Sequence, residues 1–443
     1  MTESFSVKLP EEVAQIIKAL NDNYHKAYIV GGCVRDSILN KHPKDWDIST
    51  SATTDEIKAI FNKTIDTGIK HGTVSVVIGS KVVEVTTFRT VNPDECKCLL
   101  TDLSHRDLTI NSMAYHPKEG LIDPFSGLED IKNAVIRAVG NPSDRFKEDP
   151  LRMLRAVRFS ATLEFDIDKS TLDAIKSCSQ LIVNISRERI RDELTKILIS
   201  NRPFKFILLR DVQLLKYILP EFDICFDITQ NHPYHIYNVA EHSLKAVSEI
   251  ENDIGLRWAM LLHDTGKAVT KSTDKDGTDH FYGHPEKSVD IAKNVLERLK
   301  FDNKTIAKVC RLIKHHDKLI QPDFKSVRKA VNTIGEDLFM DLLKVQEADK
   351  KGQNPEFLYA SLTELNKIKE IYKKITAERH CMSVKDLKIN GRDLLALGFR
   401  QGKEIGYILE KLLNTVLEKP ELNTYNDLIK MAKSLKNQQG ESL

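Results

Sequence analysis

The stretch "YIVGGCVRDSILNKHPKDWDIST" at residues 28–50 combines an apolar run, two glycines and a closely spaced pair of aspartates. "AYIV" predicts a short buried strand that the glycines end, "DSILN" predicts a helix, and "DWDIS" predicts the next strand. Side chains alternate along a strand, so we expect Asp45 and Asp47 on one face and Trp46 and Ile48 on the other. Two carboxylates would then lie side by side against an apolar core.

Such carboxylates repel each other unless a cation lies between them. Mg²⁺ prefers hard oxygen ligands and combines carboxylates with phosphate oxygens, so Asp45 and Asp47 are candidate Mg²⁺ ligands. A solvated strand face is the alternative for an isolated pair. The residues upstream favour the metal, because Gly32 lets the backbone approach a phosphate, a helix start attracts anions, and Arg35 adds a charged donor. The stretch therefore predicts a site for a nucleoside triphosphate and its metals.

The rest of the chain changes from mixed to helical patterning. "TTDEIKAIF" predicts a capped helix with Thr54 or Asp55 near its start, and "GTVSVVIGSKVVEVTTF" predicts two strands joined at residues 79–80. From Asn141 onward the periodicity is helical almost throughout, with loops near 230–234 and 271–285. We predict an α+β fold in which a mixed-sheet head precedes helical domains.

Composition describes an ordinary globular chain. Its 443 residues suit two to four domains, and the net charge of +2 means that a nucleic acid would have to be bound by local basic patches. The first residues are acidic and lack the apolar core of a secretory signal, and no apolar run is long enough to span a membrane. Seven cysteines without a CxxC pair favour a reducing compartment. We therefore expect a cytoplasmic protein with no membrane partner.

The opening stretch resembles the signature of polymerase-beta-type nucleotidyltransferases, specifically class II tRNA nucleotidyltransferases and bacterial poly(A) polymerases. This resemblance implies a polymerase-beta-like head and template-independent addition of CMP and AMP, from CTP and ATP, to the 3′ end of tRNA. It implies two Mg²⁺ ions at Asp45 and Asp47, one activating the 3′-hydroxyl and one binding the triphosphate. Glu84 would be a third carboxylate, although a glutamate at a strand end is often simply exposed. Further blocks agree in order: "KTIDTGIKHGTVSVV", "EVTTFR", "HRDLTINSMAY", "IDPFSGLEDI" and "RFKEDPLRMLRAVRF".

Base selection without a template is predicted for "EDPLRMLRAVRF". An arginine donor and an aspartate acceptor match the hydrogen-bonding edges of both cytosine and adenine, whereas uracil and guanine present the opposite polarity. The resemblance assigns these roles to Asp149 and Arg152, and nucleotide contacts to Arg155 and Arg158. A solvated basic helix face is the alternative interpretation.

The sequence departs from the family pattern in two places, one near the phosphates and one in a loop that affects addition of the second nucleotide. In "HRDLTINSMAY", Arg106 and Asp107 match the family's pair near the sugar and phosphates, but His105 replaces the usual first arginine. Only fifteen residues, 90–104, separate "TFR" from "HRD". CCA-adding members usually have a longer loop there, which helps to switch the pocket from CMP to AMP. CC addition, with a separate A-adding enzyme, is therefore the alternative to full CCA addition; a poly(A) polymerase would usually carry long basic extensions, which this chain lacks.

The sequence from His232 onward resembles an HD-type metal-dependent phosphohydrolase domain. By that resemblance His242, His263, Asp264 and Asp349 would hold a divalent transition metal or Mg²⁺. A phosphohydrolase or phosphodiesterase activity, alone or in addition, is a further alternative, as is a helical scaffold without metal. Lys267 belongs to the HDxGK run, and a second metal would be bound by His284 with His315 or His316.

The C-terminal block "LKINGRDLLALGFRQGKEIGYILEKLL" resembles that of many bacterial class II enzymes. Lys403 and Lys411 would meet RNA phosphates, since double-stranded RNA is bound mainly by shape and backbone charge. The expected domains are a nucleotidyltransferase head at 1–138, a helical neck with the nucleotide-recognition motif at 139–220, an HD-type metal-binding domain at 221–360 and a tRNA-binding tail at 361–443.

Overall fold

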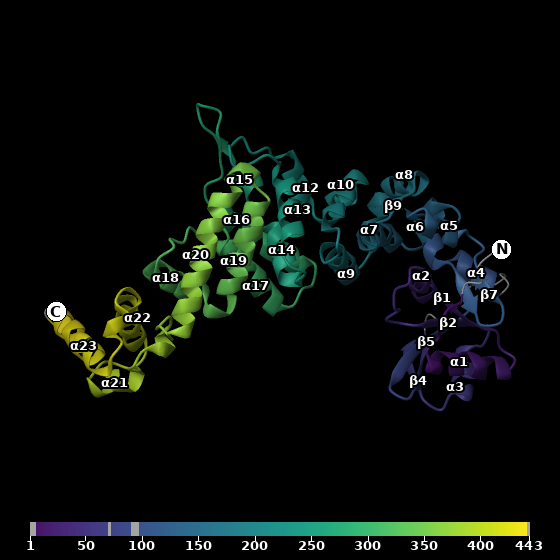
Figure 1. The fold of residues 1–443 in the computed structure, drawn as a ribbon, viewed down its shortest axis with the longest axis horizontal. Helices are drawn as coiled ribbons and strands as arrows, with labels where there is room; N and C mark the ends of the chain where they lie inside the picture. The colour runs from purple at the N-terminus through teal and green to yellow at the C-terminus, as the bar shows by residue number, and fades with distance from the viewer. Residues whose placement is uncertain (1–5, 70–71, 90–96, 441–443) are drawn as a thin grey trace. The chain divides into compact units, whose positions relative to one another are not determined.

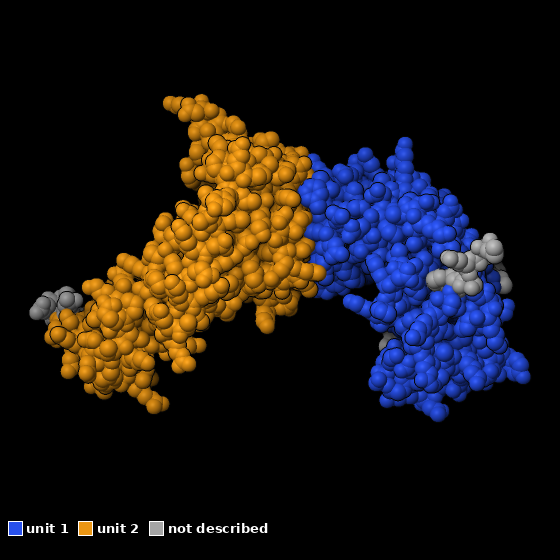
Figure 2. Space-filling view, viewed as in Figure 1, with its two compact units in different colours: residues 1–220 blue, residues 221–443 orange. Residues whose placement is uncertain are grey.

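The computed structural model describes residues 6–69, 72–89 and 97–440. The chain divides into two compact units, residues 1–220 and 221–443 (Figure 2). Unit 1 contains the sheet and the helices that follow it, and unit 2 is almost entirely helical (Figure 1). The predicted mixed-sheet head followed by a helical remainder is confirmed. The finer division into four domains stays a prediction.

A mixed sheet forms the head of unit 1. Among the described residues it has seven strands in the order β3-β4-β5-β2-β1-β6-β7. β2 runs parallel to β5, with Asp47 opposite Glu84, and β2 pairs with β1 in the antiparallel sense. The strands are β1 (Ala27–Val30), β2 (Asp47–Thr50), β3 (Thr64–Gly68), β4 (Thr73–Ile78), β5 (Lys81–Thr87), β6 (Ala114–His116) and β7 (Gly120–Ile122). The accompanying helices are α1 (Glu11–Asp22), α2 (Gly32–Ile38), α3 (Thr54–Ile60), α4 (Leu99–Ser104), η2 (Thr109–Asn111) and α5 (Gly127–Lys132).

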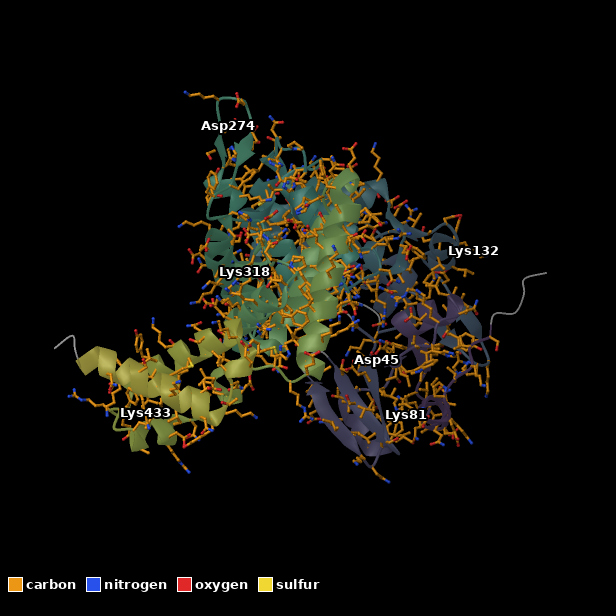
Figure 3. All side chains as sticks on the ribbon, turned by 60° about the vertical axis from the view of Figure 1, so that its left-hand side comes forward. Asp45, Lys81, Lys132, Asp274, Lys318 and Lys433 are labelled. Atoms are coloured by element: carbon orange, nitrogen blue, oxygen red, sulfur yellow. The ribbon has the colours of Figure 1, made fainter. Side chains whose placement is uncertain are left out.

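Local chemistry explains these elements. The predicted hairpin is confirmed: β4 and β5 pair on either side of Gly79, whose φ of 59° suits a glycine, and Lys81 opens β5 (Figure 3). Helix α3 begins at Thr54 and is capped by Thr53, one residue before the predicted start. The Thr53 hydroxyl accepts from the Glu56 N–H, and the Glu56 carboxylate accepts from the Thr53 N–H.

The remainder of unit 1 is a set of helices after the head. Its central helix α7 buries Leu151, Leu154 and Val157, which form an apolar stripe at three-residue spacing. A two-stranded parallel pair, β8 with β9, was not predicted. The elements are β8 (Val135–Ile136), α6 (Pro142–Glu148), α7 (Leu151–Leu163), β9 (Asp166–Ile167), α8 (Lys169–Cys178), η3 (Ser179–Asn184), α9 (Arg187–Leu198), η4 (Pro203–Ile207), α10 (Leu208–Asp211) and α11 (Leu215–Ile218).

Unit 2 consists of helices and one small hairpin. The predicted loop at 271–285 contains β10 (Ser272–Thr273) and β11 (Asp279–His280), and α16 begins at His284, so that Pro285 lies inside a helix. Asp274 lies near the turn of this projecting hairpin (Figures 1 and 3). The other elements are α12 (Pro220–Asp223), η5 (Ile224–Asp227), α13 (Val239–Glu249), α14 (Ile254–Leu262), α15 (Lys267–Thr270), α16 (His284–Arg298), α17 (Asn303–His315), α18 (Phe324–Ile334), α19 (Glu336–Lys351), η6 (Pro355–Phe357) and α20 (Leu358–Ala377).

The last part of unit 2 has an apolar cluster of its own. Leu394, Ile408, Leu412, Val416 and Leu428 are fully buried there. Its elements are η7 (Val384–Asp386), α21 (Gly391–Ala396), α22 (Lys403–Glu418), η8 (Pro420–Leu422) and α23 (Tyr425–Gly440). Over the ranges that the structure describes, helices with the length and apolarity of a membrane span are absent.

Candidate active sites

Asp45 and Asp47 lie at the N-terminal end of β2. Asp47 is the first residue of the strand, and Asp45 is exposed in the bend before it. Ile48 is fully buried, whereas Trp46 is only half-buried. The predicted alternation therefore applies to Asp47 and Ile48, but the regular strand does not reach Asp45.

The electrostatics around Asp47 favour a cation. Burial raises the pKa of Asp47; Arg106 opposes this, whereas Glu84 and Asp45 raise the pKa further. A positive charge beside Asp47 would therefore stabilise its ionised form. Asp45 and Asp47 offer hard oxygens of the kind that a divalent metal ion prefers, and Glu84 lies opposite Asp47 in the pairing of β2 with β5.

The glycine turn before α2 brings the backbone close to these groups. Gly31 has a φ of 79°, and a Cβ there would lie 2.9 Å from Arg106 Nη1 and 3.9 Å from Asp47 Oδ2. Arg106 is held in place because its Nη2 donates to Asp102 Oδ2 at 3.1 Å and to Ser49 Oγ at 3.3 Å. Asp102 is completely buried. The Arg106 guanidinium is thus fixed between the glycine turn and Asp47, where it can donate charge-assisted hydrogen bonds to an anion.

Arg35 is anchored in a similar way. Its Nη1 donates to Asn111 Oδ1 at 2.6 Å, and its Nε and Nη2 donate to Asp36. Its guanidinium carbon lies 4.9 Å from the centre of the Phe159 ring, over which Arg155 and Arg158 also lie. Phe159 was missed by sequence reasoning, although an aromatic residue directly after Arg158 could have indicated it.

The predicted arginines of α7 are paired with buried carboxylates. Arg155 Nε lies 2.6 Å from Asp107 Oδ2, and Arg158 Nε lies 2.6 Å from Glu193 Oε2. Burial alone would raise the pKa of Asp107, but Arg155 and the amide of Asn111 lower it to about 2. The second partner, Glu193 of α9, was also not predicted.

The predicted base-reading pair is held by neighbouring groups. Asp149 ends α6, where its Oδ1 accepts from the Leu151 N–H at 3.1 Å and its Oδ2 from Arg189 Nη2 at 2.8 Å. Arg152 donates to Glu148 Oε2 at 2.7 Å and to the His105 carbonyl at 2.9 Å. The Asp149 carboxylate, an acceptor, and the Arg152 guanidinium, a donor, are therefore held by neighbouring groups three residues apart in the sequence.

A cleft of about 960 Å³ brings these groups together. This volume lies within the range of small-molecule sites, and the lining carries more arginine and lysine than carboxylate side chains. Ten predicted residues of the head and neck line it, together with several that were not predicted, whereas Glu84 is not among the lining residues. The predicted ones are Gly32, Arg35, Asp45, Asp47, Arg106, Asp107, Asp149, Arg152, Arg155 and Arg158; the others include Lys41, His42, Lys44, Phe159, Arg189 and Lys196.

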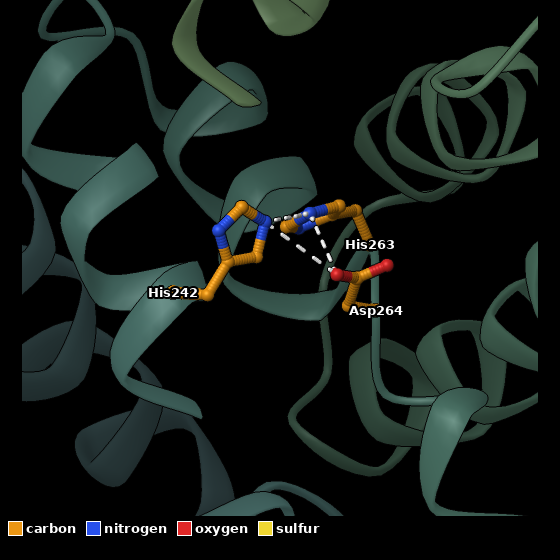
Figure 4. A group of neighbouring side chains, drawn as sticks. All are labelled: His242, His263 and Asp264. Atoms are coloured by element: carbon orange, nitrogen blue, oxygen red, sulfur yellow. Dashed lines mark hydrogen bonds and ion pairs between the residues drawn. The ribbon is translucent and has the colours of Figure 1, made fainter. Parts of the chain in front are cut away.

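Unit 2 contains a second, separate cluster. His242 of α13 and His263 after α14 meet at 3.3 Å between their Nε2 atoms, and Asp264 Oδ2 lies 3.5 Å and 3.3 Å from them (Figure 4). Asp349 Oδ1 of α19 lies 2.9 Å from His242 Nε2 and 3.3 Å from His263 Nε2. Four predicted residues from distant parts of unit 2 are therefore brought together.

Asp264 also faces a second pair of histidines. Its Oδ1 lies 3.3 Å from His284 Nε2 and 3.6 Å from His316 Nε2, and these two nitrogens are 3.3 Å apart. The structure places His316 in the cluster. His315, its neighbour at the end of α17, is not among the clustered groups.

The histidines of the cluster are oriented as metal ligands are. In all four the Nδ1 atom faces a backbone carbonyl, at 2.7 to 3.1 Å, which leaves Nε2 as the lone-pair donor. The chemistry of this donor set fits one or two divalent metals. The carbonyl partners belong to Gly352, Met260, Phe281 and Ile313.

Lys267 of the HDxGK run is buried beside the cluster. Its Nζ lies 2.7 Å from Asp264 Oδ2 and donates to Gln230 Oε1 at 2.8 Å. Nearby, burial, followed by the charges of Lys267 and His242, lowers the pKa of His235 to about 3. Gln230 and His235 were not predicted, although both precede α13 in the histidine-rich segment.

Family models assign the class. The poly(A) polymerase head domain matches residues 27–137, the RNA- and SrmB-binding site of polymerase A matches 164–225, and domain 2 of tRNA nucleotidyltransferase matches 286–432. Unit 1 therefore begins with a nucleotidyltransferase head, a class of domain that works with divalent metal ions. Residues 226–285, which contain His242, His263 and Asp264, lie between the second and third ranges.

Comparison with individual proteins assigns the family. The CCA-adding enzyme of Ligilactobacillus salivarius is 34% identical over 447 residues, covering 96% of this chain and 98% of that protein. The CCA-adding enzyme of Limosilactobacillus reuteri is 47% identical over 203 residues, and the chain spans about half (50%) of its length. The chain belongs to the CCA-adding enzyme family of tRNA nucleotidyltransferases, which confirms the resemblance of its motifs.

Solved structures agree with this assignment. The Bacillus stearothermophilus CCA-adding enzyme in complex with CTP has a TM-score of 0.73 and 26% identity, covering 99% of this chain and 100% of that one. The Thermotoga maritima CCA-adding enzyme complexed with tRNA has a TM-score of 0.63 and 22% identity, covering 98% and 96%. The second likeness concerns the fold alone.

Proposed function

We propose that this chain adds CMP and then AMP, from CTP and ATP, to the 3′ end of tRNA without a template. The observation that carries the proposal is that one cleft in unit 1 brings the groups for this reaction together. It combines metal-type carboxylates at Asp45 and Asp47, an anchored guanidinium at Arg106, and a fixed acceptor and donor at Asp149 and Arg152. Full-length similarity to a CCA-adding enzyme, and a structural relative that binds CTP, support it.

The protein's own groups would orient the triphosphate. Two Mg²⁺ ions bound at Asp45 and Asp47 would supply activation of the tRNA 3′-hydroxyl and neutralisation of the leaving pyrophosphate. The backbone of Gly31 and Gly32 leaves room for phosphate oxygens, and Arg106 provides a donor beside them. Asp107 holds Arg155 against the cleft wall. The reacting groups are thereby positioned, which is the main protein contribution to phosphoryl transfer.

Base selection would use the polarity of one acceptor and one donor. The Asp149 carboxylate would accept from the amino group of cytosine or adenine, and Arg152 would donate to the adjacent ring nitrogen. Uracil and guanine would place an acceptor against the Asp149 carboxylate and a donor against Arg152, so neither hydrogen bond to the base would form. The carboxylate and guanidinium are already anchored, so little ordering is needed when the base binds.

CC addition remains the alternative form of this activity. Part of the short segment on which it rests, residues 90–96, lies outside the described residues, and residues 99–104 form α4. We favour full CCA addition because the relative that matches 98% of its own length is a CCA-adding enzyme.

One experiment separates the two forms. Three tRNA transcripts, ending at the discriminator base, at C and at CC, are incubated with Mg²⁺ and CTP, ATP or both, and product lengths are read to one nucleotide. AMP added to the CC-ended transcript is the expected result. Arrest after two cytidines would establish CC addition, and no incorporation on any transcript would contradict the proposal.

The cluster in unit 2 supports a second activity, hydrolysis of a phosphate ester. The observation that supports this activity is the position of the Asp264 carboxylate. One oxygen faces His242 and His263 and the other faces His284 and His316, an arrangement that suits a binuclear metal centre. The test is release of nitrophenol from bis-p-nitrophenyl phosphate with Mn²⁺, Ni²⁺, Co²⁺ or Mg²⁺. Activity that Asp264→Asn abolishes while CMP incorporation is retained would support it, and no turnover with any metal would contradict it.

The remaining parts of the proposal concern the RNA. The tail would bind the double-stranded part of tRNA through its phosphates; Lys403 and Lys411 of α22 are the candidate contacts. A cytoplasmic location follows from the proposed substrates.

A further inference from the structure

Asp149, the proposed acceptor for the base, is fixed at two points. The Leu151 N–H donates to Oδ1 at 3.1 Å, and Arg189 Nη2 donates to Oδ2 at 2.8 Å. Leu151 belongs to the same turn of chain, whereas Arg189 belongs to α9, forty residues further along. The terminal torsion of an aspartate has broad minima, so these two contacts determine the direction of the carboxylate.

Arg189 lies at the surface of the nucleotide cleft, outside the packed core. Its side chain lines the nucleotide cleft and also a neighbouring cavity of about 820 Å³, which Lys147 and Ile185 border as well. The side chain is 51% exposed, and that of Asp149 is 30% exposed. The ion pair therefore forms a wall between two open spaces rather than part of a packed core.

The other half of the base-reading pair does not depend on α9. Arg152 is held by Glu148 from its own turn and by the carbonyl of His105 from the head. Removing Arg189 would thus leave the donor in place and free only the acceptor. If the Asp149 carboxylate points away from the base, its hydrogen bond with the amino group of cytosine is weaker. Its repulsion of the uracil carbonyl is weaker as well.

We propose that Arg189 is a specificity-determining positioning residue, which aims the Asp149 carboxylate at the base and so sets discrimination against UTP. The inference rests on the proposed nucleotidyl transfer, because it takes Asp149 as the acceptor for the base. Arg189 itself does not need to contact the nucleotide.

The experiment compares three full-length variants on a tRNA transcript that lacks CCA. Arg189→Met removes the guanidinium, and Arg189→Lys keeps the positive charge but loses the planar arrangement of N–H donors. Arg191→Met is the control. Arg191 lies on the same helix, donates from Nε to Asp192 Oδ1 at 2.9 Å, and is absent from the lining of both cavities. Single-nucleotide incorporation gives kcat and KM separately for CTP and UTP.

For Arg189→Met we expect KM for CTP to rise roughly tenfold, kcat to stay within about threefold, and the CTP-to-UTP ratio of kcat/KM to fall roughly tenfold. Arg189→Lys should lie between this variant and the wild type, and Arg191→Met should match the wild type. An unchanged CTP-to-UTP ratio in Arg189→Met would overturn the inference. If that variant melts early, the ratio in Arg189→Lys decides instead, and a wild-type ratio there would overturn it.

A second comparison tests whether Arg189 acts through Asp149. In an Asp149→Asn background, adding Arg189→Met should leave the CTP-to-UTP ratio where Asp149→Asn alone has put it. A further fall of the same size as in the single variant would overturn the inference. Failure of the proposed function would look different, because the wild-type chain would then incorporate no CMP.

Discussion

Asp107 and Arg155 form an ion pair, 2.6 Å from Oδ2 to Nε, that joins the segment after α4 to helix α7. The carboxylate also accepts from the Leu108 N–H and from the amide of Asn111. The pair therefore connects the head, which contains the proposed metal ligands Asp45 and Asp47, to helix α7, which contains Arg152, the proposed base-reading arginine.

This pair predicts a pH-dependent contribution to stability. Burial opposes ionisation, but Arg155 outweighs it and lowers the pKa of Asp107 from 3.8 to about 2. Because the pKa in the folded state is depressed, the contribution is present above pH 3.8 and is lost as the pH falls towards 2. It amounts to about 2 kcal/mol, and Asp107→Asn should lose this amount at pH 7.

Thermal unfolding of unit 1, followed by calorimetry between pH 7 and pH 3, measures the difference. The wild type and Asp107→Asn should differ by a constant amount down to about pH 5, and the difference should begin to shrink below about pH 4. Asp166→Asn is the control, because the Asp166 side chain is 96% exposed and its pair with Lys205 should contribute little. A difference that does not change with pH would contradict this account.

Asp47 should behave in the opposite way. Burial, assisted by Glu84 and Asp45, raises its pKa, so the ionised carboxylate destabilises the metal-free fold at neutral pH. Asp47→Asn should therefore melt no lower than the wild type in the presence of a chelator, while CMP incorporation falls at least about a thousandfold. Mg²⁺ should raise the melting temperature of the wild type more than that of the variant. Retained incorporation would remove Asp47 from the metal site.

The sequence was sufficient to predict the head and ten of the residues that line its cleft, because these residues lie within short motifs. Gly32, Arg35, Asp45 and Asp47 lie within sixteen positions of one another, and local spacing relates them. Arg189 comes from a different helix, so only the tertiary structure shows that it holds Asp149. A weaker signal existed: Arg189, Glu193 and Lys196 recur on one face of α9.

The hairpin at 272–280 was missed for another reason. Its strands are two residues long and are stabilised by contacts outside the hairpin, such as Lys271 with Asp279 and the Asn231 N–H with Asp279 Oδ2. Strand periodicity cannot appear in two residues, so the polar stretch was expected to be a loop.

Gly31 and Gly79 provide a matched test of the proposed phosphate-binding role of the turn at Gly31 and Gly32. Both have positive φ, 79° and 59°, but a Cβ on Gly31 would meet Arg106 Nη1 at 2.9 Å, whereas a Cβ on Gly79 would have nothing within 4 Å. Both alanine variants should lose about 1 to 3 kcal/mol of stability, because of the backbone strain.

Only Gly31→Ala should raise KM for CTP, since Arg106 is fixed by Asp102 and cannot move aside without losing that contact. We expect an increase of roughly tenfold, which is the scale of one charge-assisted hydrogen bond. Steady-state kinetics at a temperature where both variants are folded measures it. An equal increase in Gly79→Ala would mean that the effect is general destabilisation.

His315 and His316 are adjacent in sequence, but the structure gives them different roles. Consecutive residues of a helix point about 100° apart, and His316 continues the buried stripe of Val309 and Ile313. Its Nε2 lies 3.3 Å from that of His284, and its Nδ1 faces the Ile313 carbonyl. The apolar stripe could have selected His316 from the sequence alone, since the spacing of 3 and 4 residues places it on the inner face.

The expected consequence is a difference in metal content. The wild type should bind two divalent ions in unit 2, His316→Ala should lose one of them, and His315→Ala should keep both. The number of bound ions is measured by calorimetric titration with Mn²⁺ or Ni²⁺ and by elemental analysis. All variants carry Asp47→Asn, so that metal bound by the head does not contribute.

Loss of one ion should lower the affinity of unit 2 for metal but leave the protein folded, because His242, His263 and Asp349 remain in place. Equal metal content in the two histidine variants would contradict the assignment of His316, and no binding by the wild type would mean that the cluster is a histidine–carboxylate network without metal.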